Sequence, residues 1–108
     1  MRNTKESRYI QAVHDIKNNS LDFALVDGIW RSACANASIG KLRPGGLLII
    51  DNANWFLPCK SYSPDSRTFA QGPASEEWTK FYNVVKKWRS IWTSSGVTDT
   101  AFYVKPYA

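Results

Sequence analysis

Two short apolar segments constrain the fold of this chain more than any other feature of its sequence. They are residues 21–26 (LDFALV) and 47–50 (LLII), and an aspartate directly follows each of them. Such near-continuous hydrophobicity is typical of strands that are covered on both faces in a parallel sheet. Residues 31–41 between them carry small apolar side chains in a helical pattern, and the breakers at 43–46 (RPGG) stop that helix and turn the chain. We therefore expect a strand–helix–strand unit with parallel strands and a right-handed crossover.

Further elements flank this unit on both sides. Residues 5–17 have the periodicity of a short amphipathic helix, and residues 53–74, rich in Pro, Ser and Gly, predict a long irregular loop. Residues 75–89 predict a helix with a serine N-cap and an aromatic stripe. Residues 91–104 predict an antiparallel hairpin whose turn contains Gly96. The expected class is α/β, with about four strands and about three helices.

The length of the chain fits one domain. Its 108 residues bury enough surface for one modest core, but they cannot hold a complete two-half Rossmann-type domain. We expect a single unit over residues 1–108. Within it, residues 5–52 form the helix–strand–helix–strand core, residues 53–74 the loop, and residues 75–106 the last helix and the hairpin.

The charge of the chain bears on its partners. The formal net charge is +5, from 14 Lys and Arg residues against 9 Asp and Glu residues. The basic residues are scattered from Arg2 to Lys105, and no signature of an RNA- or DNA-binding motif accompanies them. We expect a solvated, slightly cationic surface and no nucleic-acid partner, and we keep a basic nucleic-acid-binding protein as a third class of function.

The cysteines and the absence of long apolar runs bear on the compartment. Cys34 and Cys59 are too few and too far apart in sequence for a metal site or a disulfide scaffold. No signal peptide is recognisable, and no apolar run is long enough to span a membrane. We therefore expect reduced thiols, no membrane association and a cytoplasmic location. His14, the lone histidine, is expected on the surface, because nothing near it resembles a nucleophile elbow.

Three segments resemble a known family when they are taken in order. Residues 21–31 (LDFALVDGIWR) and 41–55 (KLRPGGLLIIDNANW) look like the fourth and fifth strands of class I S-adenosylmethionine-dependent methyltransferases, a Rossmann-like family. Residues 92–106 (WTSSGVTDTAFYVKP) are similar to the closing hairpin of that fold, whose last strand enters the sheet antiparallel. The resemblance implies a truncated methyltransferase half-domain.

The resemblance also implies what this chain lacks. In that family the strand order is 3-2-1-4-5-7-6, and the segments recognised here correspond to strands 4, 5, 7 and 6. The amino-terminal half of the family carries a Gly-rich turn and an acidic residue that bind the cofactor, and no GxGxG occurs in this sequence. We therefore expect no cofactor on the isolated chain. S-adenosylmethionine, and with it Mg²⁺, is expected only if a partner completes the fold.

The part of such a fold that binds the acceptor substrate would still be present in this chain. Asp27, Asp51 and Asn52 follow adjacent parallel strands, where ligands bind in open α/β sheets. Their oxygens suit Mg²⁺, and the pattern resembles the metal site of catechol-type O-methyltransferases. The alternative is that these residues cap turns, as Asp and Asn commonly do.

Four further residues are candidates for contacts with an acceptor substrate. Lys60 and Tyr62 are candidates by their position in the long loop, and Trp55 at its start is expected to cover either the core or a ligand. Arg31 follows the first strand, where it could hold an anionic acceptor, although a cap or a surface ion pair is the simpler role. No catalytic residue is identified.

The absence of strands 1–3 would leave residues 21–26 as a hydrophobic sheet edge, which templates pairing with another chain. We expect a homodimer or a partner chain bound through this strand, unless the first helix shields it. The function expected first is a methyltransferase-like protein without its own cofactor half, inactive alone, that acts as an oligomerising or small-molecule-binding module. The alternative is the acceptor half of a split methyltransferase completed by a partner chain.

Overall fold

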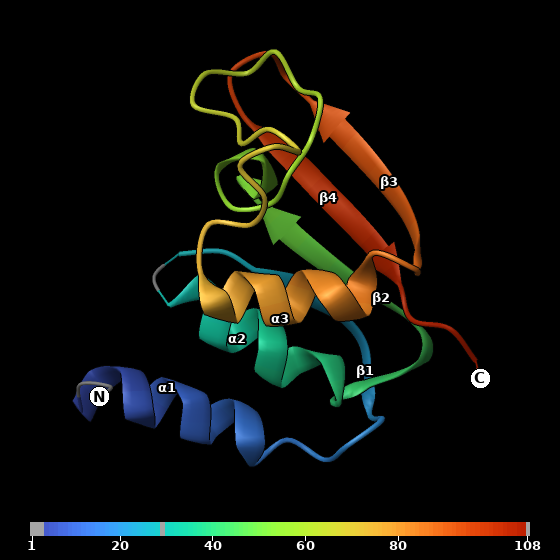
Figure 1. Cartoon of the computed structure of the whole chain (residues 1–108). Coiled ribbons are helices and arrows are strands. Elements are labelled where there is room, and N and C mark those ends of the chain that lie inside the picture. Colours follow the sequence, from blue (N-terminus) through green and yellow to red (C-terminus); the bar gives the residue numbers. More distant parts are fainter. Residues whose placement is uncertain (1–3, 29, 108) are drawn as a thin grey trace.

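The computed structural model describes residues 4–28 and 30–107 and shows a compact α/β arrangement (Figure 1). It confirms the expected class, the four strands and the three α-helices. In chain order the elements are α1 (Thr4–His14), β1 (Leu21–Val26), α2 (Arg31–Ile39), β2 (Leu42–Asp51), the short 3₁₀ helix η1 (Ala53–Trp55), α3 (Glu76–Val85), β3 (Arg89–Ser94) and β4 (Asp99–Val104). No helix of the described ranges is long and apolar enough to cross a membrane.

The four strands form one mixed sheet in the order β1-β2-β4-β3. β1 and β2 are parallel, as expected for the strand–helix–strand unit, and β4 runs antiparallel to both β2 and β3. Figure 1 shows α2 and α3 in front of the sheet, with α1 beside α2. Between α3 and the sheet, Leu48, Ile50 and Phe81 are completely buried.

Helix α3 follows from signals that are local in the sequence. The Ser75 hydroxyl accepts a hydrogen bond from the backbone N–H of Trp78 at 3.2 Å, which is the predicted N-cap. Trp78, Phe81 and Val85 lie on one face of the helix and are buried. The helix ends at Val85, earlier than the periodicity predicts, because the chain turns there and Arg89 already begins β3.

The segment 43–46 (RPGG) lies inside β2, which corrects the expectation that it separates the helix from the strand. β2 begins at Leu42, which pairs with Leu21, and the next pair joins Phe23 to Leu47. The ladder therefore contains a bulge at this segment. The physical reason is that glycines allow the β2 backbone to bend sharply within the bulge, while the pairing with β1 continues before and after it.

Gly46 is a position in this bulge where an added side chain would meet backbone atoms. A Cβ there would lie 2.8 Å from the carbonyl oxygen of Arg43 and 3.1 Å from that of Leu21, and both are backbone atoms. We expect Gly46→Ala to lower the free energy of unfolding by about 1–3 kcal/mol, measured by urea denaturation. Gly40→Ala is the matched control, because Gly40 has φ −74° and no heavy atom within 4 Å of the added Cβ. The control is expected to be neutral or slightly stabilising, and equal effects of the two changes would contradict the prediction.

The structure corrects the expectation that the first strand is covered on both faces. Val26 in β1 is buried, whereas Phe23 and Leu25, which lie on the opposite face because side chains alternate along a strand, are 64% and 58% exposed. The reason is that the helices that pack on the sheet, α2 and α3, lie on the same side of it (Figure 1). The strand also carries one charge, Asp22, whose carboxylate lies 2.7 Å from Nε of Arg43.

On the uncovered side of the sheet, one row of side chains is apolar across all four strands. The register places Leu25, Ile49, Phe102 and Ile91 in one row, because each is the direct partner of the next. The adjacent row contains Phe23, Leu47 and Val104 and ends at Arg89 in β3. The seven apolar side chains of these two rows are either exposed or half-buried, and we call them the open face.

Candidate functional site

The three residues predicted at the strand ends lie together around the guanidinium group of Arg31. Nη1 of Arg31 donates to the Asn52 side-chain oxygen at 2.8 Å and to the Asp51 backbone oxygen at 2.9 Å. Nη2 lies 3.2 Å from the Asp27 carboxylate, and Nε donates to the Gly28 carbonyl at 2.7 Å. The parallel pairing of β1 and β2 brings these groups to one edge of the sheet.

Arg31 therefore connects the ends of two strands and is more than a surface ion pair. Its side chain is 14% exposed, whereas that of Asp27 is 55% exposed. The Asp51 carboxylate accepts from the Asn52 backbone N–H at 3.0 Å and from the Thr100 hydroxyl at 3.4 Å, so all three predicted ligands are already hydrogen-bonded. This arrangement fits a guanidinium, and a divalent cation would have to displace Arg31. The metal site stays a prediction, and it requires a second conformation of Arg31.

Arg31 also reaches the aromatic residues that begin the long loop. Its Cζ atom lies 5.5 Å from the ring centroid of Phe56, within the range of a cation–π contact. Phe56 stacks on Trp78 of α3 at 4.9 Å, and Trp55 packs its edge against Phe56 at 6.4 Å. Trp55, predicted to cover the core or a ligand, is 43% exposed at the end of this aromatic row.

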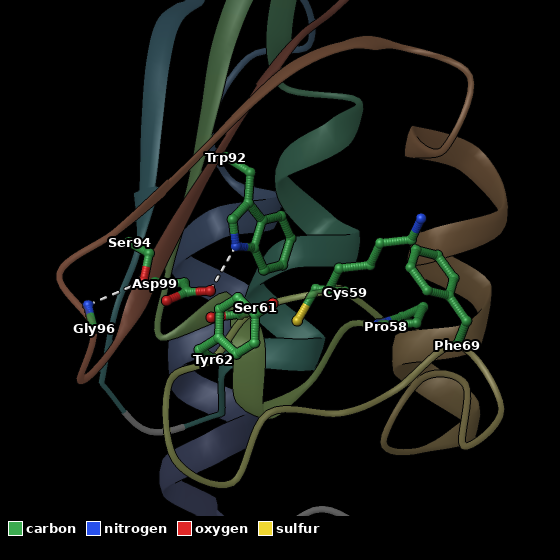
Figure 2. Close-up of a pocket in the computed structure, with 10 residues that line it drawn as sticks. Pro58, Cys59, Ser61, Tyr62, Phe69, Trp92, Ser94, Gly96 and Asp99 are labelled. Carbon is green, nitrogen blue, oxygen red and sulfur yellow. Dashed lines mark hydrogen bonds between the residues drawn. The ribbon is translucent and has the colours of Figure 1, made fainter.

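Lys60 and Tyr62 lie elsewhere, at a cavity of about 580 Å³ between the long loop and the β3–β4 hairpin (Figure 2). Neither Arg31 nor Trp55 lines it. The loop contributes Pro58, Cys59, Lys60, Ser61, Tyr62 and Phe69, and the hairpin contributes Trp92, Ser94, Gly96 and Asp99. The predicted site residues thus fall into two separate groups, one at the strand ends and one around the cavity.

The floor of this cavity is a buried carboxylate. Asp99, at the start of β4, is 1% exposed. One carboxylate oxygen accepts from the Ser63 hydroxyl at 2.7 Å and the other from the Trp92 indole N–H at 2.6 Å. Burial by itself raises the pKa of Asp99, but hydrogen bonds outweigh burial and hold the pKa below its ordinary value. Their donors are Ser61, Ser94, Ser63 and Trp92.

No family model, curated protein or solved structure matches this chain.

Asn54 connects the long loop to the hairpin, and the sequence analysis does not predict it as a site residue. It is completely buried in η1, and its side-chain oxygen accepts from the backbone N–H of Asp99 at 3.0 Å. Its amide nitrogen donates to the Ser66 hydroxyl at 3.0 Å, and its backbone oxygen accepts from the Arg67 N–H at 2.8 Å. Asn54 thus connects the loop to the hairpin through its side chain and its backbone oxygen.

The sequence reasoning missed Asp99, Trp92 and Phe69 as cavity residues. A usable signal existed for Asp99, because an acidic residue that follows the hairpin turn directly and opens an otherwise apolar strand needs a hydrogen-bonding partner. No comparable signal existed for Phe69, which meets the cavity through the path of the loop.

Proposed function

We propose that this chain is a methyltransferase-like half-domain that is inactive alone and acts as an assembly module. A second copy of the chain covers the open face, including the two exposed side chains of β1. The observation that carries the proposal is the apolar row that crosses all four strands on the uncovered side of the sheet. No cofactor is assigned to the isolated chain.

Leaving such an apolar surface in contact with water is unfavourable. Single exposed apolar residues are ordinary, but contiguous apolar patches usually mark an interaction site. Phe23, Leu25 and Ile91 are 64%, 58% and 65% exposed, and they belong to the same two rows as the half-buried Ile49 and Phe102. Two such sheets can stack about 10 Å apart with their side chains interdigitated. Edge-to-edge pairing of β1 would leave these side chains exposed, so face-to-face packing is favoured.

The strand order supports the methyltransferase-like part of the proposal. The order β1-β2-β4-β3, with β4 antiparallel to β2, is the order expected for strands 4, 5, 7 and 6 of the family that the sequence resembles. In that arrangement β1 is the position where the sheet would continue into the missing half. Among the described strands β1 pairs with β2 alone.

The assembly is tested by one substitution on the open face. We expect the unaltered chain to sediment as a dimer at about 10–100 µM, and Leu25→Lys to weaken its association at least about tenfold, because two buried ammonium groups would face each other's apolar surface. Analytical ultracentrifugation measures both. Leu25 is 58% exposed, so the change is expected to leave the stability of the monomer nearly unaltered.

Val97→Lys is the matched control. Val97 is an aliphatic residue with a similar exposure of 68%, but it lies in the β3–β4 turn and outside the open face. This variant is expected to sediment like the unaltered chain. A monomer of the unaltered chain at about 100 µM, or equal weakening by both variants, would overturn the homodimer.

The second candidate function is the acceptor half of a split methyltransferase. The cluster of Asp27, Asp51 and Asn52 favours it, since these residues end the two parallel strands where an acceptor would bind. Calorimetric titration of S-adenosylmethionine into the isolated chain should show no binding in either case. A monomeric chain that binds the cofactor only after mixing with a chain carrying a Gly-rich turn would support the split enzyme.

A further inference from the structure

The cavity between the long loop and the β3–β4 hairpin combines features that suit one class of ligand. Its volume of about 580 Å³ falls within the usual range for small-molecule sites. None of its lining residues belongs to the open face, so inferences about it are independent of the proposed assembly.

The walls of the cavity are aromatic. Figure 2 shows Trp92 on one side, Tyr62 beside the floor and Phe69 on the opposite wall. Tyr62 is fully exposed and Phe69 is 58% exposed, so the faces of both rings are available to a bound molecule. Aromatic faces carry partial negative charge and attract organic cations.

The floor carries a full negative charge that the described residues do not neutralise. Asp99 is 1% exposed, and the side chains that donate to its carboxylate, Ser63 and Trp92, are uncharged. A buried carboxylate is ordinarily paired with a cation, because desolvation of a lone charge is costly. Hydrogen bonds from hydroxyl and indole groups keep this carboxylate ionised, so the cavity has a negative floor below its aromatic walls.

The indole of Trp92 links the floor to the walls. It donates its N–H to the Asp99 carboxylate at 2.6 Å, and donation to an anion increases the electron density of the ring that faces the cavity. Lys60 is exposed and lines the same cavity. Its flexible stem lets the ammonium group remain in water, away from the floor.

We propose that this cavity binds a small organic cation, an amine attached to an apolar or aromatic group, with its charge over the face of the Trp92 ring and beside the Asp99 carboxylate to which that ring is hydrogen-bonded. The Tyr62 and Phe69 rings cover the apolar part of the ligand.

The test compares three probes of the same shape and different charge. These are 2-phenylethylamine, which is a cation at neutral pH, the neutral 2-phenylethanol, and the anion phenylacetate. We expect the amine to bind with a dissociation constant below about 1 mM and at least about tenfold more tightly than the alcohol, and phenylacetate not to bind. Calorimetry gives the affinities. The indole N–H resonance of Trp92, assigned by its disappearance in Trp92→Phe, should shift with the amine.

Two variants keep the test independent of folding. Tyr62→Ala removes a fully exposed ring, so the fold is expected to persist while the amine binds about three- to tenfold more weakly. Tyr107→Ala is the control, because Tyr107 is 82% exposed and lies outside the cavity, and it should leave the affinity unchanged. Equal binding of the amine and the alcohol, no binding of the amine at about 10 mM, or equal effects of the two variants would overturn the proposal.

Discussion

Replacing Arg31 with alanine is expected to lower the free energy of unfolding by about 2–4 kcal/mol, measured by urea denaturation. The guanidinium satisfies the Asn52 side chain and the Asp51 carbonyl at 2.8 and 2.9 Å, and both of these groups are half-buried. Its loss leaves these acceptors without a charged donor at the point where two strands end. The cation–π contact with Phe56 is lost in the same step.

Two further variants separate this effect from a simple loss of charge. Arg43→Ala removes a guanidinium from an exposed ion pair with Asp22, whose side chain is 77% exposed, and should change the free energy of unfolding much less than Arg31→Ala does. Arg31→Lys keeps the charge but cannot span the Asn52 and Asp27 oxygens, so an intermediate loss is expected. A loss in Arg31→Ala as small as that in Arg43→Ala would show that the strand-end cluster contributes little.

Removal of the Asp99 carboxylate is the second large effect expected. Asp99→Ala should destabilise the fold by about 3 kcal/mol, because it empties a buried position and leaves the donors Ser63 and Trp92 without their acceptor. Asp99→Asn keeps the volume and one acceptor, and should lose less. Urea denaturation at neutral pH measures both.

The stabilisation by Asp99 should also depend on pH in a defined direction. Its pKa is lowered in the folded state from the ordinary value of 3.8, so its charged form stabilises the fold at all pH values above that value. As the pH falls below about 4 and through the folded pKa, this contribution is lost. The difference in unfolding free energy between the unaltered chain and Asp99→Asn should therefore shrink on acidification. A difference that stays constant down to about pH 2 would contradict the prediction.

Part of the candidate site could be predicted from the sequence. Asp27, Asp51 and Asn52 could be placed together because parallel strands end at the same edge of a sheet. That Arg31 lies among them could not be read from spacing, because it depends on how α2 packs after β1. The sequence places Lys60 and Tyr62 in the same loop as Trp55, but the path of that loop brings only Lys60 and Tyr62 to the cavity.

The sequence by itself determined the order and type of the main elements, the bounds of β1, the serine cap of α3 and the hairpin, because periodicity and capping are properties of neighbouring residues. Only the tertiary structure decided which side of the sheet is covered. Phe23 and Val26 look alike in a sequence, but their burial depends on where α2 and α3 pack. The tertiary structure also decided which residues line the cavity. Asp99 and Ser63 are hydrogen-bonded although they are 36 residues apart in the sequence, and no local pattern predicts such a contact.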